Sequence, residues 1–110
     1  MATTYKVLGQ IAATANTTHN VYAVPASTQA VLSSIIICNR NDTANATYRI
    51  AVQPAAAALA NDHYIAYDAP ITALDSVALT LGVTMGNTDI LSVYSANPNV
   101  TFSVFGSEIS

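Results

Sequence analysis

Few side chains in this sequence could carry out acid–base or metal chemistry. The two histidines, His19 and His63, do not lie at the spacing of a zinc-binding motif such as HxH or HExxH. His63 is flanked by Asp62 and Tyr64, and Asp68 follows five residues later, so a general acid or base could be assembled there. The segment has no nucleophile on a recognisable turn and no glycine-rich phosphate loop. We therefore interpret both histidines as surface or hydrogen-bonded residues.

The carboxylates and the single thiol do not point to a reaction centre either. Four of the five aspartates are spread along the chain without a calcium-loop pattern, and turn or strand-end roles explain them better. They are Asp62, Asp68, Asp75 and Asp89. Cys38 is the only cysteine, which rules out an intrachain disulfide, and we expect a buried thiol that acts as a small hydrophobe. We assign no catalytic residue, no cofactor-binding residue and no metal ligand, and expect a protein that is not an enzyme and has no cofactor.

Tyrosine is the one residue type that favours a binding surface. Its ring is apolar and its hydroxyl is polar, and it is frequent at interfaces and at carbohydrate-binding surfaces. Packing in the core with the hydroxyl at the rim is the commoner role, so a glycan-binding module is kept as an alternative. The six tyrosines are Tyr5, Tyr22, Tyr48, Tyr64, Tyr67 and Tyr94.

The composition excludes several classes of partner. Charged residues make up 8% of the 110 residues, against about 25% in an ordinary soluble domain, and the net charge is −3. Lys6, Arg40 and Arg49 are the only cations, too few for a nucleic-acid surface. The apolar runs at Ile35–Cys38 and Ala55–Ala60 are too short to span a membrane. Removing water from a surface of Thr, Ser, Asn and Ala costs little free energy, which indicates contact with neighbouring proteins.

The elements that position these residues are organised around Ala30–Arg40, the most apolar strand-like stretch. Its three consecutive isoleucines are β-branched and favour a strand, and we predict that both faces of this strand are buried. On that reading, Ile36→Asp would abolish folding by burying an unpaired charge. The polar residues that follow predict a hairpin over Asn39–Asn45.

The rest of the chain reads as further strands separated by Pro, Asn, Asp and Gly turns. Ala12–Asn20 is predicted to be a loop, and Ala55–Ala60 a loop or one helical turn. The other predicted strands are Thr4–Ile11, Val21–Val24, Ala46–Gln53, Tyr64–Tyr67, Pro70–Ala73, Ser76–Met85, Asp89–Ser95 and Val100–Gly106. Since no helical crossovers separate them, we predict an all-β fold, an antiparallel β-sandwich, jelly-roll-like, with eight or nine short strands in a single domain over residues 1–110.

Five segments, taken in order, resemble a family of small virion structural proteins of tailed phages, in particular of cyanophages. They are VYAVPA from Val21, the strand VLSSIIICNR, the long stretch TYRIAVQPAAAALANDHYIAYDAPI, the strand ALTLGVTM and the terminal FSVFGSEIS. The family has a Tyr-x-Val-Pro strand end, a strand closing in Cys-Asn-Arg and a terminal Phe-Gly-x-Glu in this order. Ala23 and Ala56 depart from its usual threonine and glycine.

The resemblance implies a non-enzymatic virion component, with no catalytic residues to carry over. A head decoration or cement protein is the first expectation, and a tail, neck, baseplate or fibre-attachment protein is the second. Other virion proteins, such as the major capsid protein, would then be the partners. By analogy with phage decoration proteins, a homo-oligomer such as a trimer is expected. The N-terminus lacks a secretory signal, so we expect the protein to be made in the host cytoplasm and to reside in the virion.

Overall fold

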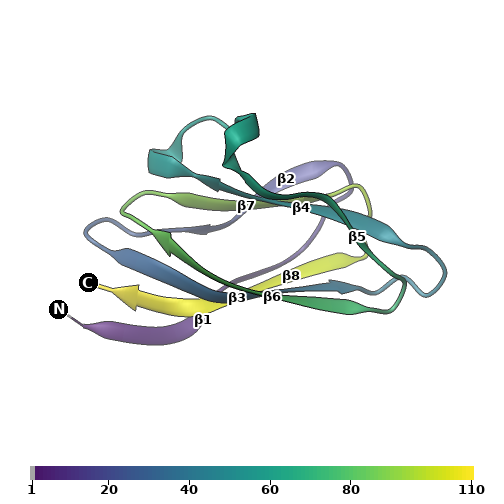
Figure 1. The fold of residues 1–110 in the computed structure, drawn as a ribbon, viewed down its shortest axis with the longest axis horizontal. Coiled ribbons are helices and arrows are strands. Elements are labelled where there is room, and N and C mark those ends of the chain that lie inside the picture. Colours follow the sequence, from purple (N-terminus) through teal and green to yellow (C-terminus); the bar gives the residue numbers. More distant parts are fainter. Residues whose placement is uncertain (1) are drawn as a thin grey trace.

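Eight strands and two short 3-10 turns make up the fold of the described residues (Figure 1). The computed structural model describes residues 2–110, apart from the side chain of Leu81. The strands are β1 (Thr3–Ala12), β2 (Thr17–Ala23), β3 (Gln29–Asn39), β4 (Ala46–Gln53), β5 (Tyr64–Ile71), β6 (Ser76–Met85), β7 (Ile90–Ser95) and β8 (Val100–Ile109). The turns are η1 (Pro54–Ala56) and η2 (Asn61–His63).

The strands form two four-stranded antiparallel sheets that pack face to face. Sheet A has the order β1-β8-β3-β6, and sheet B has the order β2-β7-β4-β5. The first strand pairs with the last, the second with the seventh, the third with the sixth and the fourth with the fifth. The chain therefore behaves as one long antiparallel ribbon whose strand pairs alternate between the two sheets. This is the jelly-roll arrangement of two Greek keys, so the predicted fold class is confirmed.

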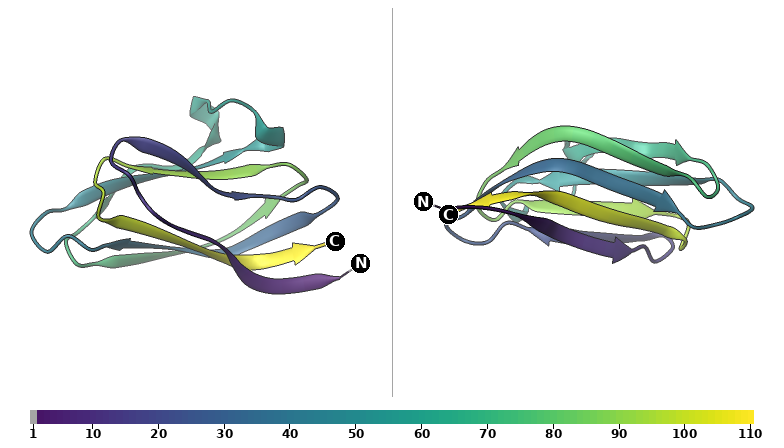
Figure 2. Two further views of the ribbon diagram at one scale, coloured as in Figure 1. Left: turned by 180° about the vertical axis from the view of Figure 1, so that it is seen from behind. Right: turned by 90° about the horizontal axis from the view of Figure 1, so that it is seen from below.

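The termini lie side by side at one end of sheet A (Figure 2). The backbone of Ala2 exchanges two hydrogen bonds with that of Ser110, at 2.7 and 2.9 Å. These bonds continue the β1–β8 ladder past the end of both strands, so the two ends of the chain hold each other in place.

Alternating apolar residues of both sheets fill the space between them. Tyr48 of sheet B meets Phe102 of sheet A edge to face, with ring centroids 6.4 Å apart. The largest fully buried side chains are Phe102, Leu32, Ile35, Ile37, Ile50, Ile71, Met85, Leu91, Val93, Val100, Val104 and Asn39. Full burial of one such apolar side chain contributes about 1.5–3 kcal/mol, which makes this layer the main source of stability.

The prediction that both faces of the Ala30–Arg40 strand are buried is wrong. β3 is central in sheet A, yet Ile36 is 36% exposed while Ile35 and Ile37 are fully buried. A β-bulge at Ser33 shifts the alternation, so that Leu32 and then Ile35 point inward. A two-layer sandwich covers only one face of each sheet, so the predicted unfolding by Ile36→Asp loses its basis.

The hairpin predicted over Asn39–Asn45 is also wrong, because β3 and β4 belong to different sheets and do not pair. The connection instead crosses from one sheet to the other around Asn39, which is fully buried. Its Nδ2 lies 3.0, 3.4 and 3.3 Å from the carbonyl oxygens of Ala44, Ile71 and Thr72, and its Oδ1 accepts a hydrogen bond from the Asn41 N–H. A side chain predicted to lie at a turn is therefore an internal anchor for two loops.

Other boundaries differ more modestly. β2 begins at Thr17, inside the predicted loop, and the two pieces predicted around Asp68 form the single strand β5. The alanine run begins with η1 and continues as irregular chain. The strands run from 6 to 11 residues. β2 and β8 are longer than predicted, because each pairs along its length with a neighbouring strand.

Candidate functional site

A β-bulge on the outer face of sheet B builds a cluster of charged and aromatic side chains. In the β4–β5 ladder, Tyr48 pairs with Ala69 and Ile50 pairs with Ala66. One residue of β4, Arg49, therefore faces two residues of β5, Tyr67 and Asp68. Asp68 has a φ of 50°, in the left-handed region that aspartate tolerates better than most residues. The bulge thus directs both Tyr67 and Asp68 toward Arg49.

Arg49 contacts three partners at once. Its Nε and Nη2 donate to the two carboxylate oxygens of Asp68, at 2.7 and 3.3 Å. Its guanidinium carbon lies 4.1 Å from the ring centroid of Tyr67 and 4.6 Å from that of Tyr94 on β7. Both distances are within the range of cation–π attraction. We call Arg49, Tyr64, Tyr67, Asp68 and Tyr94 the arginine–tyrosine cluster.

The Arg49–Asp68 pair makes the cluster electrically balanced. The hydrogen bonds from Arg49 lower the pKa of Asp68, so the carboxylate stays charged at neutral pH. The same bonds raise the pKa of Arg49 above its usual value. A bidentate pair, in which two N–H groups donate to the two carboxylate oxygens, fixes the orientation of the guanidinium plane as well as the position of the guanidinium.

Tyr64 and Tyr67 form an aromatic corner beside this pair. Their rings meet edge to face with centroids 4.8 Å apart and an angle of 77° between the planes. Together with Asn61 they line an open depression of about 490 Å³. We call Asn61, Tyr64 and Tyr67 with this depression the tyrosine corner.

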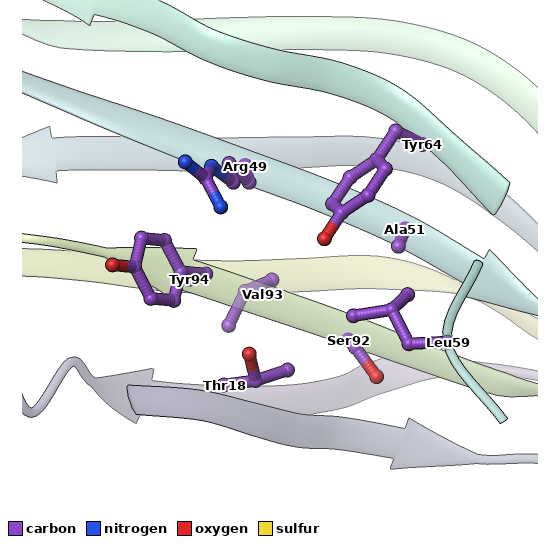
Figure 3. A pocket seen from close by; sticks show the side chains of 8 residues that line it. All are labelled: Thr18, Arg49, Ala51, Leu59, Tyr64, Ser92, Val93 and Tyr94. Atoms are coloured by element: carbon purple, nitrogen blue, oxygen red, sulfur yellow. The ribbon is translucent and has the colours of Figure 1, made fainter. Parts of the chain in front are cut away.

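A second, much smaller space lies on the other side of Tyr64 (Figure 3). Tyr64, Tyr94 and Leu59 surround it, and Ala51 and Ser92 lie beneath them. Its volume of about 10 Å³ is close to the minimum that holds one water molecule. It can hold no larger ligand unless the side chains move.

The segment Pro54–His63 carries Leu59 and Asn61 and stands above the outer face of sheet B (Figure 1). Two hydrogen bonds tie it to Gln53 of β4 and to Asp89 before β7, and a third closes the segment on itself. The Ala55 N–H donates to Asp89 Oδ1 at 2.8 Å, Gln53 Nε2 donates to the Ala57 carbonyl at 2.8 Å, and the Ala60 N–H donates to His63 Nδ1 at 3.1 Å. The loop that borders the tyrosine corner is therefore tied to the sheet.

Of the two aspartates that the sequence places near His63, Asp62 stays beside it, whereas Asp68 does not join it in an acid–base site. Asp68 binds Arg49, and His63 accepts a loop hydrogen bond and lies 3.7 Å from Asp62. His19 accepts a hydrogen bond from the Thr14 N–H at 3.0 Å. Both histidines are hydrogen-bonded, as predicted. Within residues 2–110, no group of three or more His, Cys, Asp or Glu side chains comes together in a way that could hold a metal ion.

Asp75 and Asp89 have the turn and strand-end roles predicted for them. Asp75 accepts from the Ser76 N–H at 2.8 Å, and Asp89 accepts from the Gly86 N–H at 2.8 Å. Cys38, predicted to be buried, is a free thiol that is only half-buried. It pairs across the ladder with Thr101 and Ser76, on the outer face of sheet A.

The tyrosines divide between core and surface in a way the sequence did not reveal. Tyr22 and Tyr48 are buried between the sheets, as the commoner role predicts. Three others gather in the arginine–tyrosine cluster, and Tyr5 is 83% exposed on sheet A. The cluster depends on the register of three strands distant in sequence. The sequence carries one signal of it, the spacing of Tyr64, Tyr67 and Asp68. In a regular strand, Tyr64 and Tyr67 would point to opposite faces, as would Tyr67 and Asp68.

Tyr22 and Glu108, from the first and last of the motifs quoted above, meet in space. The Tyr22 hydroxyl donates to Glu108 Oε2 at 2.5 Å, and Lys6 Nζ donates to Oε1 at 3.1 Å. The bond from Tyr22 lowers the pKa of Glu108, while burial and that carboxylate raise the pKa of Tyr22. This contact joins sheet B to sheet A, so these two motif residues have a structural role.

A second candidate surface covers the outer side of sheet A. Directly paired residues of antiparallel strands point to the same side of a sheet, so the ladder identifies its members. We call this surface the sheet A face: Thr3, Tyr5, Val7, Gln10 and Ala12 of β1; Thr101, Ser103, Phe105, Ser107 and Ile109 of β8; Gln29, Val31, Ser34, Ile36 and Cys38 of β3; and Ser76, Ala78, Thr80 and Thr84 of β6. None of these residues is charged, and Tyr5, Val7 and Ile36 are exposed apolar side chains.

Comparisons with protein-family models, with curated proteins and with solved structures find no match for this chain. Of the helical segments in the described part of the chain, none has the length and apolar character needed to cross a membrane.

Proposed function

We propose that the protein is a non-enzymatic structural protein of a phage virion, most simply a decoration or cement protein on the head. The observation that carries the proposal is the uncharged sheet A face with its exposed Tyr5, Val7 and Ile36. The sequence resemblance to small virion proteins of tailed phages supplies the class of particle. A tail, neck or baseplate position is the second candidate, because the same face could pack on any virion subunit.

Burying the sheet A face requires little desolvation. Hydroxyl, amide and apolar side chains lose less hydration free energy at an interface than Lys, Asp or Glu, which interface cores lack. Four strands of about ten residues cover roughly 600 Å², on the order of the ~800 Å² that each partner contributes to a standard interface. The charged side chains lie outside this face, so they can keep their water when it is covered.

The expected partners are other virion proteins and further copies of this chain. β1 and β6 are the edges of sheet A, and each leaves one row of backbone groups free for a neighbouring subunit. A closed homo-oligomer such as a trimer would use such an edge, and the analogy with phage decoration proteins supports this state. The proposal includes no nucleic-acid partner and no membrane partner.

The position on the particle is tested by imaging intact virions and by measuring copy number against the major capsid protein. A head decoration protein predicts density over the capsid lattice and a copy number of the same order as the capsid protein. A tail or neck protein predicts density at one vertex and a small fraction of that number. Absence of the protein from purified particles would contradict both versions.

The role of the sheet A face is tested by Ile36→Asp, which places one charge at its centre. We expect folded protein that is no longer incorporated into particles, since the carboxylate would have to lose its water at the interface. Thr47→Asp is the matched control, because Thr47 is exposed and pairs with Pro70 on the outer side of sheet B. If Ile36→Asp is incorporated normally and Thr47→Asp is not, the face has been assigned wrongly.

A further inference from the structure

We propose that the tyrosine corner on sheet B, formed by Asn61, Tyr64 and Tyr67, is a binding site for a neutral carbohydrate. This goes beyond the structural role, because it lies on the opposite sheet from the sheet A face and uses none of its residues. A virion protein could therefore bind its neighbours through one sheet and a sugar through the other.

The shape of the corner suits a sugar ring. Tyr67 is 56% exposed, and the Tyr64 ring stands at 77° to it, so the pair offers two aromatic surfaces at a near right angle. The C–H groups of a pyranose can pack on one ring while its hydroxyls reach the other, because tyrosine combines an apolar body with a polar tip. The Asn61 side chain adds an amide donor and acceptor. The volume of about 490 Å³ lies within the usual range for small-molecule sites.

The charges beside the corner favour a neutral ligand. Arg49 is the one cation among the described residues of the cluster, and Asp68 occupies its fork at 2.7 and 3.3 Å. Asp62, next to Asn61, is exposed and carries a further negative charge. A phosphate or an acidic sugar would meet a cation already neutralised by Asp68 and would be repelled by Asp62. A purely apolar ligand would cover the polar tips of both tyrosines without giving them hydrogen-bond partners.

The corner is held in place before any ligand arrives. Arg49 packs over the Tyr67 ring at 4.1 Å, and the bulge at Tyr67 and Asp68 is closed by the bidentate ion pair. The ring therefore loses little conformational freedom when a sugar packs on it, which reduces the entropic cost of binding. Open aromatic sites of this kind, without a deep pocket, are consistent with weak affinity for one sugar and stronger binding through many copies on a particle.

The test is an NMR titration of the isolated 110-residue chain with neutral oligosaccharides of glucose, galactose and mannose, each up to tens of millimolar. We expect saturable shifts at Asn61, Tyr64 and Tyr67 with at least one of these probes. Tyr67→Ala should weaken that binding at least about tenfold, a loss of roughly 1.4 kcal/mol. Tyr5→Ala is the matched control, since Tyr5 is 83% exposed on sheet A, and it should bind as the wild type does.

Three results would overturn the proposal: no saturable binding by any neutral probe, equal binding by Tyr67→Ala and wild type, or tighter binding of sialylated or phosphorylated sugars than of neutral ones. The outcome is separate from that of the structural proposal. Tyr67→Ala should still be incorporated into particles, whereas Ile36→Asp should still bind the sugar that the wild type binds.

Discussion

Replacing Ile36 and Ile37 by aspartate, one at a time, tests which face of β3 is buried. The two residues are adjacent in a central strand of sheet A and have the same side chain. Ile36 is 36% exposed on the sheet A face, whereas Ile37 is fully buried between the sheets. The same substitution therefore places a carboxylate in water at one position and in the apolar core at the other.

The expected costs differ by several kcal/mol. Full burial of an isoleucine contributes about 1.5–3 kcal/mol, so the two thirds of Ile36 that is covered contributes roughly 1–2 kcal/mol. Loss of a β-branched residue from a strand adds up to about 1 kcal/mol, giving about 1–3 kcal/mol for Ile36→Asp. At Ile37 the lost packing alone costs about 2–5 kcal/mol, and the buried carboxyl group adds several more. A domain of this size has a total stability of about 5–15 kcal/mol, so Ile37→Asp should be largely unfolded.

Urea denaturation followed by circular dichroism measures both variants against the wild type. Ile36→Asp should give a cooperative transition at a lower midpoint with an unchanged slope, and Ile37→Asp should show little or no folded baseline. If Ile36→Asp were as unfolded as Ile37→Asp, the outer side of sheet A would have to be covered within the monomer. The assignment of the sheet A face would then be refuted.

Substitutions at two further positions, Asn39 and Glu108, test the internal polar contacts. Asn39→Ala should lower the free energy of unfolding, measured in urea, by about 3 kcal/mol, since it removes a buried amide from three backbone carbonyls. Asn39→Asp should lower it at least as much, because a carboxylate cannot donate to those carbonyls. A loss below about 1 kcal/mol for both variants would contradict the anchoring role. The pKa of Glu108 is lowered in the folded state by the hydrogen bond from Tyr22, so its contribution to stability is present above about pH 4.3 and is lost as the pH falls further. In thermal unfolding between about pH 2 and pH 7, Glu108→Gln should therefore lose less stability on acidification than the wild type. If the stability of the variant and of the wild type fell in parallel with pH, the Tyr22–Glu108 contact would contribute nothing to that dependence.

Local patterns were sufficient for the class of fold. The strands predicted from the alternation in Ala46–Gln53 and Ser76–Met85 begin and end at the same residues as β4 and β6. The turn residues and the lack of helical crossovers indicated antiparallel sheets in a jelly-roll-like sandwich, which the structure confirms. These features depend on neighbours within a few residues, and a single sequence contains that information.

The errors arose where a residue's environment depends on distant strands. Three isoleucines in a row indicate a strand but not how many layers cover it, and the bulge at Ser33 leaves Ile36 on an open face. Asn39 resembles a turn residue in the sequence, yet it is buried because the chain crosses between sheets at that point. Neither fact follows from local propensity.

The sequence by itself determined that this protein is an all-β chain with few charges, because composition and period are local properties. The tertiary structure alone decided which polar and aromatic side chains meet. Arg49, Tyr67 and Tyr94 come from three strands, and a one-residue change in the β4–β5 register would send Arg49 to the core side and disperse the arginine–tyrosine cluster. Register is set by packing across the whole sandwich, which is why both candidate surfaces emerged only from the folded chain.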